Sequence, residues 1–217
     1  MLFHFSFLLA TTPAVQPGQD PTRGQATRRR IRDEALGLFY RQGFRATTMR
    51  EITSACGLTP AAFYNHFASK DELLFEIVED AFWGLNEEVK SSIDMADAGT
   101  AAQLSALIRS MTLWHCAHLR QAKVANRETQ ELNEALAAKV LGHWNRLRSL
   151  IEEIIAAGMS SGEFQPPGKA GGATARILST AIVGFPRSIS GTSLKSLNPE
   201  EHADMLETLV LWMVGIR

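Results

Sequence analysis

The sequence predicts an all-α protein with a small N-terminal three-helix domain and a larger helical C-terminal domain. Apolar residues recur every three or four positions in successive segments, which is the period of helices with one buried face. Glycines, prolines and helix-capping residues fall between these segments and mark their starts and ends. The 217 residues are 45% apolar and 21% charged, an ordinary globular composition. No apolar run approaches the ~20 residues of a transmembrane helix, so we expect no membrane partner.

Charge divides the chain into two parts. Residues 23–70 hold nine basic and three acidic residues, a net charge of +6. Residues 71–217 hold 13 basic and 19 acidic residues, a net charge of −6. A basic block on an acidic body indicates an anionic partner for the block alone. The two cysteines, Cys56 and Cys116, are too few for a disulfide framework, so a reducing, cytoplasmic location is expected.

Residues 1–22 are expected to form an irregular arm. The run MLFHFSFLLA is apolar, but no basic residue precedes it, as a secretory signal would require. Pro13, Pro17, Gly18 and Pro21 then favour irregular chain up to the first helix.

Three short helices are predicted within the basic block, residues 23–70. The first runs from about Arg23 to Arg41 and ends at Gly43. Thr48 begins the second, because Thr48-Met49-Arg50-Glu51 has the form of a capping box. Gly57 allows a tight turn, after which Thr59 caps a third helix with Pro60 at its first position. Apolar positions along these helices are Ile31, Ala35, Leu38, Phe39, Met49, Ile52, Ala55, Cys56, Phe63 and Phe67.

A helix, a glycine turn and a second helix over residues 48–67 form a helix-turn-helix pattern, whose second helix enters the DNA major groove. Short Ala61 and Ala62 permit close approach, and an alanine methyl can contact a thymine methyl. Asn65 can read a base edge, while hydroxyl and amino groups bind phosphate oxygens. The residues expected to contact DNA are Arg45, Thr47, Thr48, Arg50, Thr59, Pro60, Ala61, Ala62, Tyr64, Asn65, His66 and Lys70.

Each of these residues also has an ordinary structural interpretation. Tyr64 can be a half-buried packing residue, and Asn65 and His66 can be solvated positions. The basic block can also belong to a module that binds a partner or a membrane surface without operator specificity. The combination of the residues expected to contact DNA, on a segment of charge +6, favours binding in the major groove.

Residues Thr27 to Leu74 resemble the N-terminal domain of the TetR family of transcriptional regulators. The shared features are Phe39 with Gly43-Phe44, Thr47-Thr48, Glu51-Ile52, Gly57, Tyr64-Asn65-His66-Phe67 and Ser69-Lys70-Asp71-Glu72-Leu73. One departure is Cys56, where the family usually has alanine. The resemblance implies a dimeric, ligand-responsive regulator, more often a repressor than an activator. In such a dimer two recognition helices about 34–36 Å apart match a palindromic operator.

The acidic part, residues 71–217, is predicted to contain five further helices and to bind ligand and form the dimer. Ser69 begins the helix that carries Leu74, Ile77, Val78, Ala81 and Leu85. Thr100 and Gln103 are expected to cap the next helix. A long helix spans Asn133 to about Ser160, and another spans about Ala170 to Gly184, where Pro186 ends or kinks it. Asn198 caps the last helix, with Pro199 at its first position.

A ligand cavity is expected at the far end of the helix that begins near Thr100. Its apolar stripe of Leu104, Leu107, Ile108 and Met111 continues to His115 and His118, which suggests a polar-lined cavity. Alternatively, both histidines bond backbone or water. A metal site lacks a third ligand nearby, and an enzyme using Cys116 is disfavoured because Cys116 lies about 100° around the helix from His115. We expect no cofactor and no metal. The predicted ligand-binding residues are Met111, Trp114, His115, His118, Trp144 and Arg187.

The last two helices are expected to form the dimer interface. Ala181 and Gly184 allow close helix approach, and the resemblance implies a four-helix bundle with the same helices of a second subunit. The predicted interface residues are Ile177, Ala181, Leu206, Leu209, Val210 and Met213.

From Trp114 to Arg217 the chain is similar to TetR-family members that regulate the breakdown of fatty acids, steroids and other acyl-CoA substrates. The similarity lies in Arg127-Glu128, Gly158 with Gly162-Glu163-Phe164, Phe185-Pro186-Arg187 and residues 196–201. Ser188-Ile189-Ser190 stands where those members usually have an aromatic cluster. An apolar or acyl-CoA-type effector is therefore expected, and the alternative is a regulator of drug efflux that responds to lipophilic aromatic compounds.

Overall fold

The computed structural model describes residues 23–167, 172–189 and 198–216, with the backbone alone at residues 172 and 186–189. In these ranges the chain forms α-helices and one 3₁₀ turn, without strands, so the all-α prediction is confirmed. The predicted arm, residues 1–22, lies outside the described residues. The helices are α1 (Arg23–Gln42), α2 (Met49–Ala55), α3 (Pro60–Tyr64), α4 (Lys70–Asp94), α5 (Thr100–Ala117), α6 (Leu119–Glu128), η1 (Thr129–Glu131), α7 (Glu134–Ser161), α8 (Gly172–Ile189) and α9 (Pro199–Met213).

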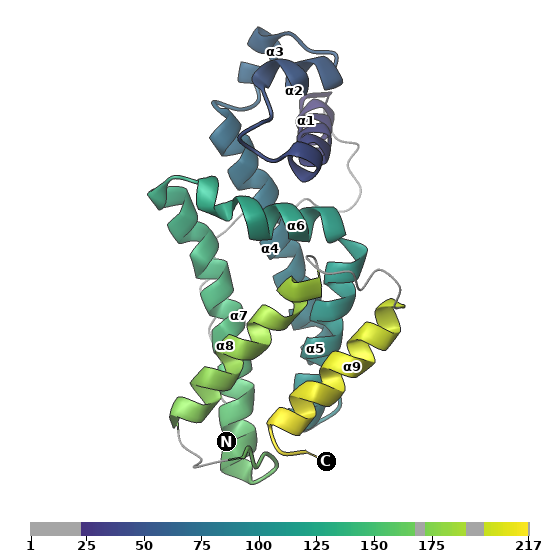
Figure 1. Cartoon of the computed structure of the whole chain (residues 1–217), viewed down its shortest axis with the longest axis vertical. Coiled ribbons are helices and arrows are strands. Elements are labelled where there is room, and N and C mark those ends of the chain that lie inside the picture. The colour runs from purple at the N-terminus through teal and green to yellow at the C-terminus, as the bar shows by residue number, and fades with distance from the viewer. Residues whose placement is uncertain (1–22, 168–171, 190–197, 217) are drawn as a thin grey trace.

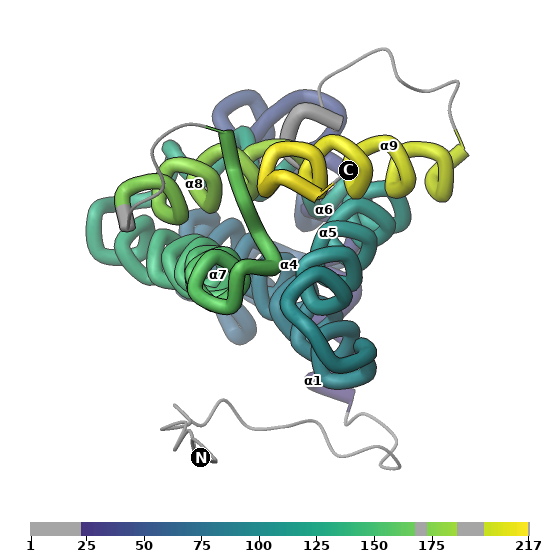
Figure 2. The backbone as a smooth tube through the Cα atoms, turned by 90° about the horizontal axis from the view of Figure 1, so that it is seen from below, coloured from purple at the N-terminus to yellow at the C-terminus, as the bar shows by residue number. Residues whose placement is uncertain are grey.

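The three short helices α1–α3 form one end of an elongated molecule (Figure 1). α4 runs from this end into a body formed with α5, α7, α8 and α9. α6 lies across the molecule between the short helices and the body, and it packs against both α1 and α4. Seen from below, α8 and α9 lie on the same flank (Figure 2).

The small N-terminal unit is held by the apolar residues that the periodicity identified. Ile31 and Phe39 of α1 are fully buried together with Ile52 of α2. Phe63 and Phe67 are also buried, and their rings stack with centroids 5.7 Å apart. The inward orientation predicted for both phenylalanines is confirmed.

Two arginines of α1 join this unit to α4. Arg28 donates from Nε to Glu76 Oε2 at 3.0 Å, and its guanidinium lies 4.0 Å from the centre of the Phe67 ring. Arg32 forms an ion pair with Glu76 at 3.1 Å and a second with Asp80. Part of the +6 charge is therefore already neutralised by acids of α4 and is not available to an anionic partner.

The start of α5 differs from the sequence prediction. Gly99, with φ +126°, takes the capping position, and Thr100 is the first residue of the helix. The free N–H groups of Thr100 and Ala101 donate instead to the Glu163 carboxylate, at 3.1 and 3.0 Å. The cap thus comes from the end of α7, 63 residues away in the sequence, which local patterns do not reveal.

Two features of the helical body were not predicted. α6 was missed because its sequence is largely polar, with only small apolar residues on its buried face. α8 does not end at Gly184 but continues past Pro186 to Ile189, so of the two outcomes expected at this proline, an end or a kink, the end is excluded. The cap predicted for α9 is confirmed, because Asn198 accepts from Glu200 N. Asn133, where the long helix was predicted to begin, caps α7 by accepting from Leu136 N.

Candidate DNA-binding surface and effector cavity

α2 and α3 are positioned by local hydrogen bonds that the sequence predicted. Thr48 accepts from Glu51 N at 3.2 Å, and its own N–H donates to Glu51 Oε2 at 2.7 Å, which completes the capping box. The bond from Thr48 N, together with bonds from the Gln42 amide and the Thr48 hydroxyl, lowers the pKa of the Glu51 carboxyl. Gly57 makes the turn with φ +60°, and Thr59 caps α3 by accepting from Ala62 N at 3.2 Å. The two helices therefore form a helix-turn-helix unit with both N-termini fixed.

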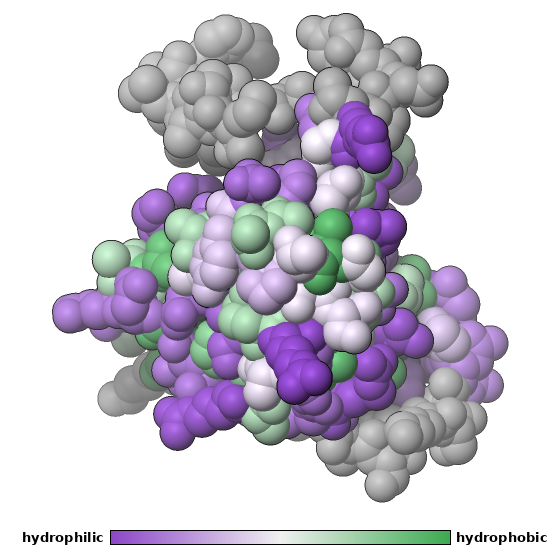
Figure 3. Space-filling view, turned by 90° about the horizontal axis from the view of Figure 1, so that it is seen from above, coloured by the Kyte–Doolittle hydropathy of each residue, from purple (hydrophilic) through white to green (hydrophobic). Residues whose placement is uncertain are grey.

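Most of the residues expected to contact DNA are exposed on this unit. Tyr64 has 56% of its surface accessible, although its ring also meets Phe63 edge-on. Ala62 and His66 are half-buried, and the exposed members are Arg45, Thr48, Arg50, Thr59, Pro60, Ala61, Tyr64 and Asn65. Seen from above, this end of the molecule combines pale and light-green residues at its centre with strongly hydrophilic residues around them (Figure 3). Small and polar groups are thus available for contact with a nucleic acid.

Two of the predicted phosphate ligands have a structural role in the loop between α1 and α2. Thr47 is buried, and its hydroxyl donates to the Gly43 carbonyl at 2.7 Å. Lys70 donates from Nζ to the carbonyls of Phe44 and Thr47, at 2.9 and 2.8 Å, and lies 4.2 Å from the centre of the Phe44 ring. Both side chains bind carbonyls of the loop between α1 and α2. The buried Thr47 hydroxyl uses its single proton there, so its prediction as a phosphate donor is wrong. Lys70 is half-buried and its ammonium has a third N–H, so its contact with phosphate stays a prediction.

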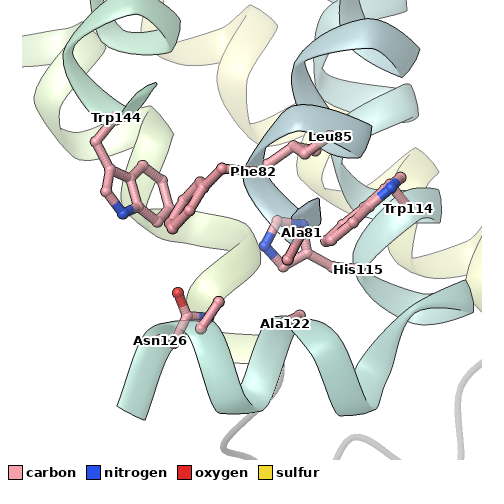
Figure 4. A pocket seen from close by; sticks show the side chains of 9 residues that line it. Ala81, Phe82, Leu85, Trp114, His115, Ala122, Asn126 and Trp144 are labelled. Atoms are coloured by element: carbon pink, nitrogen blue, oxygen red, sulfur yellow. The ribbon is translucent and has the colours of Figure 1, made fainter. Parts of the chain in front are cut away.

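One small cavity lies in the body, between α4, α5, α6 and α7. Trp114 and His115 of α5 and Trp144 of α7 line it, as Figure 4 shows. The Phe82 and Trp144 rings meet edge-on with centroids 4.8 Å apart. The remaining lining residues are Ala81, Phe82 and Leu85 of α4 and Ala122, Ala125 and Asn126 of α6.

The cavity is almost filled by its own side chains in this conformation. Its volume is about 10 Å³, enough for about one water, whereas small-molecule sites have volumes of ~300–1,000 Å³. His115 is buried, and its Nδ1 lies 2.8 Å from the Met111 carbonyl. The backbone bond that was left open as an alternative for this histidine is therefore present, and the ring also lines the cavity.

Two predicted ligand-binding residues, Met111 and His118, are not among the residues that line the cavity. Met111 is buried in the surrounding core. His118 ends α5, is exposed and stacks on the Trp114 ring at 4.7 Å, because the helix breaks before the apolar face reaches it. The side chain of Arg187 lies outside the described residues. Sequence reasoning missed the α6 lining, for which the only signal was the pair Ala122 and Ala125, three residues apart.

The described residues offer little support for an enzymatic site around Cys116. Burial raises the pKa of its thiol, which favours the unreactive protonated form. Within the described ranges no three or more histidine, cysteine or acidic residues form a group that could hold a metal ion. None of the described helices is long and apolar enough to span a membrane.

α6 makes contacts on two faces. One face carries the cavity-lining residues just described. The other contacts α1: Arg127 Nη2 donates to the Phe39 carbonyl at 2.5 Å, and Lys123 Nζ lies 5.0 Å from the centre of the Tyr40 ring. α6 thus joins the cavity to α1 of the small N-terminal unit.

The exposed apolar residues of α8 and α9 lie where the dimer interface was predicted, but the exposed face of α9 is made of partly different residues than predicted. Val210 is fully buried, because it shares the inner stripe of α9 with Ala203 and Val214; its prediction as an interface residue is wrong. The outer stripe is Met205, Leu209 and Trp212, the last 62% exposed, and with Asp204 and Thr208 these residues line an open hollow of about 520 Å³. Of the other predicted interface residues Ile177 is exposed, and Ala181, Leu206 and Met213 are half-buried.

Comparison with known proteins agrees with this architecture. Residues 31–77 match the family of bacterial regulatory proteins of the tetR family, and residues 97–185 match a tetracyclin repressor-like C-terminal domain. The HTH-type transcriptional repressor KstR2 of Rhodococcus jostii (strain RHA1) is 30% identical over 158 residues, which are 69% of this chain and 74% of that protein.

Two solved structures share the fold. A bacterial regulatory protein in the tetR family from Rhodococcus RHA1 is 25% identical, with a TM-score of 0.80 over 88% of this chain and 98% of that one. AibR, solved in complex with isovaleryl coenzyme A and operator DNA, is 21% identical, with a TM-score of 0.74 over 88% of this chain and 100% of that one. The matches to both the N-terminal and the C-terminal part of this chain, together with KstR2, show that the chain belongs to the TetR family of transcriptional regulators.

Proposed function

We propose that the protein is a dimeric repressor that leaves a palindromic operator when a small apolar or acyl-CoA-type effector enters the cavity between α4, α5, α6 and α7. Each recognition helix, α3, contributes Ala61 and Asn65 to a major groove, and Thr48, Arg50 and Tyr64 bind the phosphates beside it. Repression is favoured over activation because the relative KstR2 is a repressor.

The position of α6 is the observation that carries this proposal. Ala122, Ala125 and Asn126 line the cavity, while Arg127 of the same helix donates to the Phe39 carbonyl at the end of α1. An effector that displaces α6 therefore also acts on the helix that supports the recognition unit. α4 offers a second route, because it also lines the cavity and its Glu76 and Asp80 pair with Arg28 and Arg32 of α1.

The small volume of the cavity means that an effector must bind a more open conformation than the one described. About 10 Å³ is too little for any organic effector, so binding requires α6 or its neighbours to move outward. The conformation that binds effector then differs from the closed one, and an effector shifts the population towards it. A coupling free energy of about 1–3 kcal/mol weakens operator binding roughly 5- to 150-fold.

The lining supports two classes of effector. AibR carries isovaleryl coenzyme A in the same fold, which favours an acyl-CoA thioester. Phe82, Trp114 and Trp144 bring three aromatic rings to the cavity, which favours a flat aromatic compound of the kind that efflux regulators bind. A thermal-shift panel of acyl-CoA thioesters, free fatty acids and aromatic drugs distinguishes these classes.

Operator binding is tested with a gel shift on the DNA upstream of the gene. Tyr64→Ala and Ala61→Glu are expected to abolish the specific complex at unchanged circular dichroism. Ala138→Glu, an exposed alanine of α7, is the matched control for the added charge. Unchanged operator affinity in the two α3 variants would refute the assignment of the recognition helix.

The effector site is tested with two histidines that lie three residues apart. His115→Gln changes the cavity wall, whereas His118→Gln changes an exposed ring outside it. Once the panel has yielded a compound that releases the operator, we expect His115→Gln to reduce that release and His118→Gln to preserve it. Equal effects of the two variants would place the effector elsewhere.

A further inference from the structure

An ion pair connects the helix-turn-helix unit to the C-terminal domain. Arg45, in the loop between α1 and α2, donates from Nε to Glu131 Oε2 at 2.6 Å. The Arg45 side chain is 83% exposed, whereas that of Glu131 is only 14% exposed. The carboxylate is therefore enclosed, and the arginine extends from it into solvent.

The geometry leaves most of the guanidinium available. Only Nε is bonded to Glu131, and the structure gives Nη1 and Nη2 no hydrogen bond within the described residues. A guanidinium has five N–H donors, so four of them remain for a second acceptor. Arg45 also lies three residues before Thr48, the cap of α2, and so belongs to the segment that leads to the expected phosphate contacts.

Glu131 is attached to the helix that lines the cavity. It ends η1, which follows α6 directly, so a shift of α6 moves the Glu131 carboxylate. Arg45 in turn takes part of its orientation from that carboxylate, because a long flexible side chain is otherwise free to rotate.

We propose that Glu131 is a positioning residue for DNA binding: it holds Arg45 so that the free Nη groups bind a phosphate of the operator. Displacement of α6 by an effector then withdraws this contact directly. The inference rests on the proposed function, since it needs both an operator and a moving α6.

The direction in which Glu131→Gln changes operator affinity separates a positioning role from simpler electrostatic ones. Glu131→Gln removes a negative charge close to the DNA, and long-range electrostatics alone therefore predicts tighter binding. The same tightening follows if Glu131 competes with phosphate for Arg45. A positioning role predicts weaker binding in spite of the lost charge, because Arg45 must then be ordered by the DNA alone.

The test measures operator affinity by fluorescence anisotropy over a range of salt concentrations for the full-length protein. Arg45→Ala is expected to weaken binding roughly tenfold and to lower the slope of log affinity against log salt by about 0.9 per protomer. Glu131→Gln should weaken binding about two- to tenfold. Glu134→Gln, three residues further on, removes the same charge at an exposed site and should leave affinity unchanged or slightly higher.

Double variants show whether the two residues act together. In an Arg45→Ala background, Glu131→Gln should no longer weaken binding. Arg45→Lys keeps the charge but loses the planar fork whose Nε and Nη groups point at different acceptors, so Glu131→Gln should have little further effect there either. An equal loss from Glu131→Gln in all three backgrounds, or tighter binding in the wild-type background, would overturn the proposal.

Failure of this inference is distinguishable from failure of the proposed function. If the wild-type protein binds no operator, the proposed function fails and the role of Glu131 fails with it. If the wild-type protein binds its operator but Arg45→Ala changes neither affinity nor salt slope, only the present inference is refuted. Melting temperatures measured on the same variants exclude a loss of folding.

Discussion

Gly158 and Gly142 lie in the same helix, α7, yet the same substitution is expected to have opposite effects at the two sites. A Cβ atom at Gly158 would lie 2.3 Å from Cδ2 and 2.6 Å from Cγ of the buried Phe164 ring. The ring cannot simply swing away, because Phe164 is buried and its backbone is fixed by the bond from its N–H to the Gly158 carbonyl at 2.9 Å. At Gly142 the added Cβ would meet nothing within 4 Å.

These contacts give the expected magnitudes. In a helix interior, alanine is favoured over glycine by about 1 kcal/mol, so Gly142→Ala should stabilise the fold by up to that amount. Overpacking at Gly158 costs about 2–3 kcal/mol, which leaves Gly158→Ala destabilising by roughly 1–2 kcal/mol. For a chain of this length, 1 kcal/mol corresponds to about 2–4 °C in melting temperature.

Thermal melts at one fixed protein concentration measure both changes, since dimer formation makes the melting temperature depend on concentration. A third measurement isolates the cause: in a Phe164→Ala background the ring is gone, and Gly158→Ala should then raise the melting temperature. If Gly158→Ala and Gly142→Ala both stabilise the wild-type protein, the close approach of Phe164 to α7 is not as described.

Three further predictions concern the cap of α5, the dimer interface and the loop between α1 and α2. Hydrogen bonds from Thr100 and Ala101 hold the pKa of Glu163 below its ordinary value of 4.5, so this cap stabilises α5 fully above pH ~4.5 and is lost as the pH falls through the lowered value. Glu163→Gln should therefore lower the melting temperature at pH 7, with a difference from wild type that shrinks in melts at pH 3.5. Leu209→Glu should give monomers in size-exclusion chromatography, whereas Val210→Ala should lower the melting temperature but leave a dimer; the reverse pattern would restore Val210 to the interface. Lys70→Ala should weaken operator binding without changing its salt slope, because Lys70 supports the loop; a slope lower by about 0.9 per protomer would show that it binds phosphate.

The sequence was sufficient where structure is determined by neighbours in the chain. The capping box at Thr48 and the turn at Gly57 depend on residues at most three positions apart, and both were predicted. Phe63 and Phe67 were placed inward by their spacing alone. The pattern in each case reflects a local hydrogen bond or one face of one helix.

The remaining errors come from contacts between distant segments. Lys70 donates to carbonyls 23 and 26 residues away, a structural role that its neighbours in the sequence do not reveal. The charge available to an anionic partner is also smaller than the +6 counted for the basic block, since Arg28 and Arg32 form ion pairs with α4. Val210 was assigned to the wrong face of α9 because an apolar stripe on both sides of a helix does not reveal which side meets the protomer's own core.

The four tryptophans of the chain lie in two kinds of environment, which should give them different fluorescence. Trp114 and Trp144 line the cavity, whereas Trp83 and Trp212 are more than half exposed. Emission from the first pair should change in wavelength and intensity when a compound enters, and Trp212 should respond when protomers associate. Replacing Trp83 and Trp212 by phenylalanine leaves the cavity pair as an intrinsic fluorescent reporter, so effector titrations need no attached dye.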